Sequence, residues 1–135
     1  MVVCAKHRVN FYDTDLMKVV HHSNYIRWFE IGRVEFLRAA GISLNDMMDD
    51  GFVFPITDVR CKYLSPGHFD DVLIIEVTPR ALTKAKMEFD YRIIREADNE
   101  VLVTGFTQNV FTSKETGKIT RITDKYQEKL KKMLD

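Results

Sequence analysis

A single long helical pattern, followed almost to the end of the chain by strand patterns, most constrains how this sequence can fold. Between Ser23 and Ala40, apolar residues recur at spacings of three and four, which is the spacing of one buried helix face. Gly41 follows directly and is expected to end the helix. The residues predicted to form the buried stripe are Tyr25, Trp28, Phe29, Gly32, Phe36 and Ala39.

Strand patterns dominate the rest of the sequence. A short first strand is expected around Lys6 to Phe11, and Ser43, followed three residues later by Asp46, predicts a brief second helix that Gly51 ends. From Phe52 onward, apolar and charged residues alternate with the period of a strand. We predict an antiparallel meander that includes Val72 to Val77, Met87 to Ile93 and Val101 to Phe111, and then a closing helix, Asp124 to Leu134, with Tyr126, Leu130 and Leu134 on one side.

The predicted sheet is too large for the predicted helix. About five or six long strands present two faces, and a single helix covers only part of one of them. The pattern therefore predicts an α+β fold whose subunits associate, sheet beside sheet. The alternative is an ordinary monomeric α+β roll.

The composition is that of one globular domain. The chain has 135 residues and no repeat or flexible linker, so we expect residues 1–135 to form a single domain. Its 20 basic residues balance its 20 acidic residues, which argues against nonspecific attraction to nucleic acid or anionic lipid. The sequence shows neither a signal peptide nor a stretch apolar enough for membrane insertion. Cys4 and Cys61 lie far apart and fit a reducing compartment, so we expect a cytoplasmic protein.

The segment from Arg8 to Gly41 carries a detailed motif. A strand ends in Tyr12-Asp13-Thr14-Asp15, a short loop leads to Val19-Val20, and His22-Ser23-Asn24-Tyr25 opens the helix. This motif resembles the 4-hydroxybenzoyl-CoA thioesterase group of the hotdog superfamily, which includes the Tol-Pal-associated acyl-CoA thioesterases. Many members of that group carry a glycine close to the paired valines, where this chain has Met17-Lys18.

A second segment extends the resemblance over most of the chain. Tyr63-Leu64-Ser65-Pro66, followed by Asp70-Asp71 and a strand, also looks like that group. The resemblance implies a hotdog fold, in which an antiparallel sheet wraps around one long central helix. It further implies that two subunits form a continuous sheet, with active sites at their interface, and that the catalytic carboxylate is Asp15, the second aspartate of the motif.

Hydrolysis of a thioester needs a nucleophile or an activated water, together with a donor for the carbonyl oxygen. An ionised aspartate such as Asp15 can attack the carbonyl or act as base on water, and the sequence leaves both roles open. The helix that begins near His22 and Ser23 offers N–H groups without intrahelical partners, at the positive end of its dipole. We predict that the backbone N–H of His22 stabilises the oxyanion.

Each candidate residue also has a structural interpretation. Asp15 can be a turn former or helix cap, and the His22 side chain can simply orient the loop. Asp13 would point to the opposite face of a continued strand, so we assign it a turn-stabilising role. Asn24 and Tyr25 are predicted to line the substrate pocket, although Tyr25 fits the buried stripe equally well.

Other chemistries lack a supporting pattern. His21 and His22 are adjacent rather than spaced as metal ligands on a helix, so we predict neither a metal nor a cofactor. Ser23 lacks the flanking glycines of a nucleophile elbow, and Cys61 fits a core position. The basic residues that CoA phosphates would attract are expected to be solvated instead, namely Lys18, Arg60, Lys62 and Lys114.

The sequence therefore predicts a thioester hydrolase that acts on an acyl-CoA or on an acyl carrier protein thioester, as a homodimer or homotetramer. The alternative is a noncatalytic protein of the same fold that binds acyl thioesters. A hydratase of this fold would need an Asp/His pair in a hydratase motif, and the sequence carries no such motif.

Overall fold

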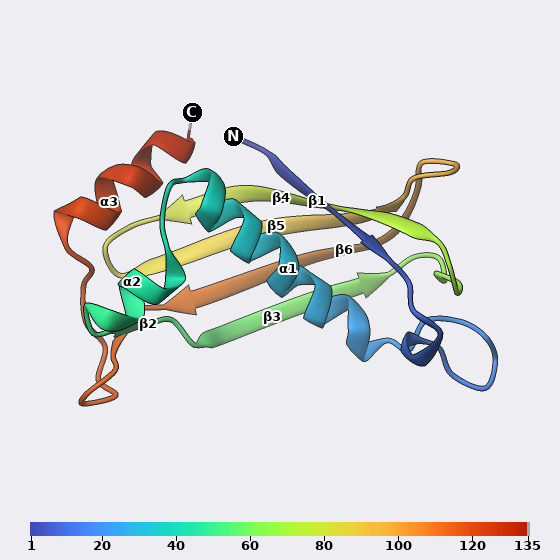
Figure 1. Ribbon diagram of the computed structural model, residues 1–135, viewed down its shortest axis with the longest axis horizontal. Coiled ribbons are helices and arrows are strands. Elements are labelled where there is room, and N and C mark those ends of the chain that lie inside the picture. The colour runs from blue at the N-terminus through green and yellow to red at the C-terminus, as the bar shows by residue number, and fades with distance from the viewer. Residues whose placement is uncertain (135) are drawn as a thin grey trace.

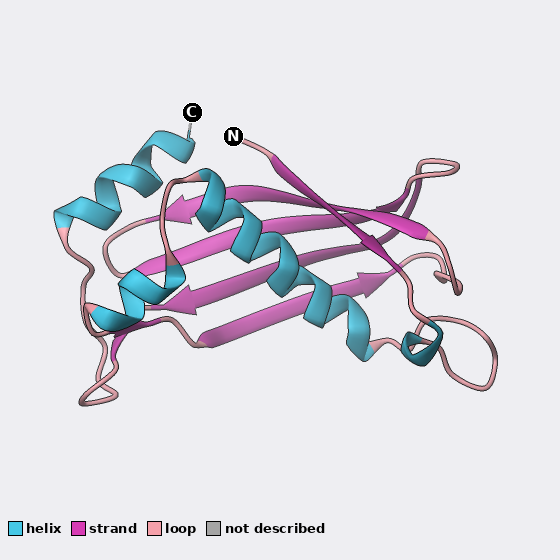
Figure 2. Cartoon of the chain, in the orientation of Figure 1, coloured by secondary structure: helices cyan, strands magenta, loops and turns pink. Residues whose placement is uncertain are grey.

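The computed structural model describes residues 1–134, in which one long helix, α1 (Ser23–Ala39), lies across a five-stranded antiparallel sheet (Figure 1). Figure 2 shows the helices gathered on the face of the sheet toward the viewer, and the strands within residues 52–113 follow one another without an intervening helix, as in an α+β fold. This confirms the predicted fold class. The other elements are β1 (Val3–Arg8), η1 (Phe11–Asp13), α2 (Leu44–Asp49), β2 (Phe52–Val53), β3 (Ile56–Tyr63), β4 (Val72–Leu82), β5 (Lys86–Arg95), β6 (Glu100–Val110), β7 (Thr112–Ser113), α3 (Asp124–Lys131) and η2 (Lys132–Leu134).

The sheet has the strand order β1-β4-β5-β6-β3. Strands β4, β5 and β6 form the predicted meander, but β3 is not its first strand. The edge of β4 is occupied by β1, whose Ala5 lies opposite Ile75. Strand β3 instead pairs with β6, with Tyr63 opposite Val103, and its other edge is open. The chain therefore crosses the end of the sheet between β3 and β4.

Helix α1 lies close to the sheet because it carries a glycine where the two meet. A Cβ on Gly32 would lie 2.5 Å from Cγ2 of Val77 and 2.9 Å from Cγ2 of Ile75. The helix ends as predicted at Gly41, which has a φ of 78° and donates to the carbonyl of Arg38. One residue of the predicted stripe differs: Ala39 is exposed, and its place in the core is taken by Leu37.

The smaller predicted elements are present with shifted limits. The first strand runs over Val3–Arg8 rather than Lys6 to Phe11, because the chain turns into η1 at Phe11. The brief helix α2 is capped by Ser43, as expected. The closing helix buries Tyr126 and Leu130, but then tightens into η2, whose shorter repeat buries Met133 and leaves Leu134 exposed.

The outer face of the sheet is polar, so it does not need a second subunit to cover it, contrary to the expectation from the sequence. Arg80 pairs with Asp90 on β5, and Arg92 pairs with Glu76 on β4. Such a face can remain in water, so a second covering layer is not required. The open edge of β3 is the feature that favours association instead. None of the helices within residues 1–134 is long and apolar enough to cross a membrane.

Phe29 of α1 packs tightly between β5 and β6. The ring of Phe29 stacks on Tyr91, with 4.3 Å between ring centroids, and it points at the backbone of Gly105. A Cβ on Gly105 would lie 2.3 Å from Cζ of Phe29 and 3.1 Å from the carbonyl oxygen of Arg60. Because Phe29 is fully buried, its ring cannot move aside.

Gly105→Ala is therefore expected to lower the free energy of unfolding by about 1–3 kcal/mol, the usual effect of overpacking a filled core. Chemical denaturation beside the wild type measures the change. Thr104→Ala, at the neighbouring outward-facing position, is the matched control. Adding Phe29→Leu should recover part of the loss, since it removes the atoms nearest the new methyl group. Unchanged stability of Gly105→Ala would contradict this account of the packing.

Candidate active site

Asp15 lies in a tight loop that joins η1 to the start of α1. Its N–H donates to the carbonyl of Val19 at 2.9 Å, and its Oδ1 accepts from the N–H of Met17 at 2.8 Å. The loop closes through Lys18, which has a φ of 63°, a conformation that favours glycine. The Asp15 side chain is exposed, and its Oδ2 accepts no hydrogen bond from any residue in the described range, 1–134.

The two ends of this loop are tied to the rest of the fold. Thr14 and Val20 form an isolated antiparallel bridge, and Val20 donates its N–H to the carbonyl of Gly67 at 2.9 Å. Asp13 is buried and accepts the N–H of Asn10 on its carboxylate at 2.9 Å. This confirms the turn-stabilising role predicted for Asp13. Figure 1 shows this loop leaving η1 and returning to the start of α1. Asp15 itself is not among the residues that line the cavity beside the helix start.

His22 is the N-cap residue of α1, but the preceding residue, His21, accepts hydrogen bonds from the first N–H groups of the helix. The N–H of Ser23 donates to Nδ1 of His21 at 3.2 Å, and the N–H of Asn24 donates to the carbonyl of His21 at 3.0 Å. The N–H of His22 itself has no hydrogen-bond acceptor among the residues that the structure describes. It therefore remains free to donate at the positive end of the helix dipole.

A cavity of about 320 Å³ opens beside this helix start. Tyr63, at the end of β3, donates its hydroxyl to the carbonyl of His22 at 3.0 Å and closes one side. Burial, together with the neighbouring Cys61 thiol, raises the pKa of Tyr63 to about 12, so the phenol keeps its proton at neutral pH. The lining residues are Val20, His22, Tyr25, Tyr63, Leu64, Ser65 and Pro66.

The two residues predicted to line the pocket behave differently. Tyr25 lines this cavity, and its ring also belongs to the core; its role in binding the substrate stays a prediction. Burial raises the pKa of Tyr25, and its oxygen accepts the N–H of Gly67 at 2.9 Å. Asn24 is buried and is not among the lining residues. Its side-chain amide donates to the carbonyl of Asp13 at 2.8 Å and holds the loop against the helix.

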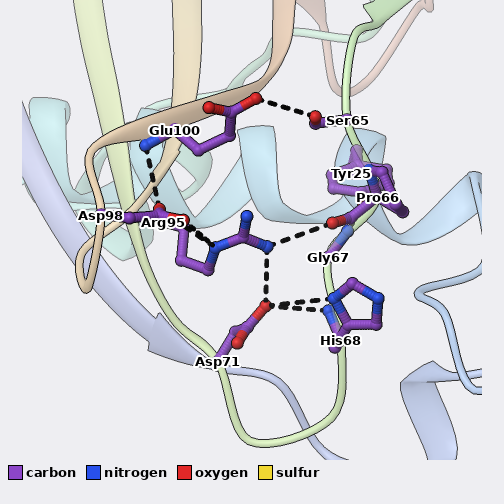
Figure 3. Close-up of polar contacts among 9 residues, drawn as sticks. All are labelled: Tyr25, Ser65, Pro66, Gly67, His68, Asp71, Arg95, Asp98 and Glu100. Carbon is purple, nitrogen blue, oxygen red and sulfur yellow. Dashed lines mark hydrogen bonds and ion pairs between the residues drawn. The ribbon is translucent and has the colours of Figure 1, made fainter.

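Arg95 organises the segment from Ser65 to His68 that forms the far wall (Figure 3). Its guanidinium donates to the carbonyl of Pro66 at 3.2 Å and to Oδ2 of Asp71 at 3.3 Å. The same Asp71 oxygen accepts the N–H of His68 at 2.9 Å. Arg95, which belongs to β5, therefore holds in place the segment between β3 and β4 that forms this wall.

Sequence reasoning missed three contributors to this site: His21, Tyr63 as a pocket residue, and Arg95. Tyr63 was within a recognised motif, so its position could have been found. His21 and Arg95 act through contacts that only the folded chain makes. Within residues 1–134, no group of three His, Cys, Asp or Glu side chains lies close enough to hold a metal ion.

Known proteins resemble this chain in sequence and in fold. The family model described as the thioesterase-like superfamily matches residues 9–130. The acyl-CoA thioester hydrolase YbgC of Escherichia coli O157:H7 is 30% identical over 95 residues, which cover 70% of each chain. A crystal structure of a protein from Aquifex aeolicus is 32% identical and has a TM-score of 0.86, over 95% of this chain and 98% of that one.

Fold similarity extends to more distant structures. A DHNA-CoA thioesterase from Staphylococcus aureus, at 24% identity, has a TM-score of 0.92 over 97% of this chain and 89% of that one. The predicted hotdog fold is thereby confirmed. The family match begins directly after β1 and ends within α3, so it includes the Asp15 loop and the whole of α1. The chain belongs to the thioesterase-like superfamily.

Proposed function

We propose that this protein hydrolyses acyl-CoA thioesters to the free acid and CoA. Asp15 carries the proposal, because the loop that leads into α1 leaves its carboxylate exposed, and because the N–H of His22 at the start of that helix has no acceptor within residues 1–134. Two relatives support the substrate. The Escherichia coli relative is an acyl-CoA thioester hydrolase, and a Staphylococcus aureus protein with a TM-score of 0.90 was crystallised in complex with CoA.

The proposed chemistry begins with the thioester carbonyl oxygen accepting the N–H of His22. In one route, an Asp15 oxygen attacks the carbonyl carbon, the C–S bond breaks, and the CoA thiolate leaves and takes up a proton. Water then hydrolyses the mixed anhydride and restores the carboxylate. In the other route, Asp15 takes a proton from a water whose oxygen attacks the same carbon; the C–S bond then breaks, and the leaving CoA thiolate takes up the proton, which restores the carboxylate. Both routes place the developing negative charge at the helix start, where backbone dipoles stabilise it.

The open edge of β3 is proposed to pair with β3 of a second copy. Its unpaired backbone groups run the length of the strand, and its exposed apolar side chains include Ile56, Val59 and Tyr63. An antiparallel pair about the strand midpoint sets Ile56 opposite Tyr63 of the partner subunit. The result is a homodimer with one continuous sheet, which can pair further into a homotetramer. The free thiols Cys4 and Cys61 fit the reducing cytoplasm, where we place the protein.

Asp15→Asn is expected to lower kcat/KM for acyl-CoA hydrolysis by about 100- to 10,000-fold, because an amide neither attacks the carbonyl nor accepts a proton from water. Free-thiol release from short, long and aromatic acyl-CoAs measures the effect, with an acyl carrier protein thioester added to the panel.

Asp70→Asn is the matched control, since Asp70 is also an exposed loop aspartate and its φ of 71° suits asparagine. Equal rates in Asp15→Asn and the wild type would refute the proposed role of Asp15. Binding without release from any substrate would support the noncatalytic alternative.

Val59→Lys is expected to convert the dimer to a monomer, because it places a charge beside the strand edge that the partner would cover. Sedimentation velocity at micromolar concentration should give the mass of two chains for the wild type and of one chain for the variant. Thr78→Lys, on a strand at the other side of the sheet, should leave the dimer intact. A monomeric wild type with full activity would rule out a site assembled across this edge.

A further inference from the structure

A second cavity of about 320 Å³ lies between α1, α2 and the start of β3. Most of its wall is apolar and includes Leu37, Leu44 and Phe54. Three polar side chains complete the wall: Glu30, which is exposed, and Arg33 from α1 and Asn109 from β6, which are almost wholly buried, at 7% and 2% exposure. The chemistry proposed above uses none of them.

Arg33 is a buried cation without a counterion. Its Nη1 donates to the hydroxyl of Tyr91 at 3.3 Å, and that hydroxyl already shares a hydrogen bond of 2.6 Å with Thr107. Burial raises the pKa of Tyr91, so the phenol stays neutral and does not balance the charge. No carboxylate among residues 1–134 forms an ion pair with Arg33, whereas Arg80, on the exposed outer face, has a two-pronged carboxylate partner.

Asn109 is the other buried polar side chain of this cavity wall. Its side-chain amide donates to the carbonyl of Phe54 at 2.7 Å, which fixes the orientation of the group. Its Oδ1 is buried and has no donor within the described residues. Within residues 1–134 the Arg33 side chain donates only to Tyr91, so the cavity wall keeps guanidinium donors without a protein partner. Leaving a buried charge unpaired is unfavourable unless a ligand or partner supplies the opposite charge.

We infer that this cavity binds the far end of the acyl group, and that Arg33 binds a carboxylate there. The inference rests on the proposed hydrolase function and deepens it: the favoured substrates are CoA thioesters of dicarboxylic acids. A guanidinium fork matches a carboxylate in charge and in shape, and the apolar walls suit the methylene chain that leads to it. Glu30 also lines the cavity, but it is exposed and lies at the solvent side.

The position of the cavity fits a site shared between two copies. The cavity borders Ile56 at the beginning of β3, whereas the cavity beside His22 borders Tyr63 at the end of the same strand. In an antiparallel β3 pair, the beginning of one strand meets the end of the other. The Arg33 cavity of one subunit thus continues the His22 cavity of its partner, and the acyl chain runs from one to the other.

The test compares thioesters of equal chain length that differ only at the far end: adipoyl-CoA with hexanoyl-CoA, and suberoyl-CoA with octanoyl-CoA. Of adipoyl-CoA and suberoyl-CoA, the one that the wild type hydrolyses faster is expected to have at least a 10-fold higher kcat/KM than the methyl-ended thioester of the same length. Arg33→Met should remove about 10- to 100-fold of this rate and leave the methyl-ended substrates within about 3-fold of the wild type. Arg33→Lys keeps the charge but not the forked guanidinium, so its kcat/KM on the carboxylated thioesters should lie between those of the wild type and Arg33→Met.

Arg38→Met is the matched control, because Arg38 lies on the same helix but is exposed and pairs with Glu35. It should leave both substrate classes unchanged. A wild type that prefers the methyl-ended thioesters, or an Arg33→Met variant that loses activity equally on both classes, overturns the inference while the hydrolase function stands. If Arg33→Met does not fold, the wild-type preference decides alone. Release from none of the four thioesters also overturns the inference, and the wider panel of short, long, aromatic and carrier-protein thioesters then decides the proposed function separately.

Discussion

The close approach of α1 to the sheet is the contact on which the rest of the structure depends. Gly32 lets the helix backbone lie against Val77 and Ile75, and Phe29 fills the space that Gly105 leaves open. This contact fixes both the height and the rotation of the helix. As a result, the N-cap at His22 lies at the first cavity, and Arg33, three turns further along, lines the second. One packed helix therefore positions two separate polar features.

The candidate site is built largely from backbone groups and from residues that hold them in place. His21 satisfies the first N–H groups of α1, which leaves the N–H of His22 unpaired. Asp13 and Asn24 tie the loop to the helix, and Arg95 ties down the wall at Pro66. Asp15 is the exception, because its exposed side chain offers a reactive group of its own. Because a backbone N–H is proposed to bind the carbonyl oxygen, the proposed hydrolysis needs only one reactive side chain, Asp15.

The sequence was most informative where a local pattern determines local structure. The helix from Ser23, its end at Gly41 and the cap at Ser43 follow from spacing and turn chemistry, and the structure has all three. The placement of β3 beside β6 did not follow, because strand order depends on contacts between distant segments. For the same reason the buried guanidinium of Arg33 was not foreseen. On a helical wheel it reads as an exposed charge, and only the packed sheet and α2 enclose it.

The open edge of β3 also bears on solubility. An unpaired strand can accept any extended segment, so a newly made chain carries a template for aggregation until that edge is covered. Alternate residues along β3 are charged, namely Asp58, Arg60 and Lys62, and they flank the apolar side chains of the opposite face. Charges at such positions disfavour indiscriminate strand addition. The same strand is thus suited to one specific neighbour and protected against the many others that a crowded cell offers.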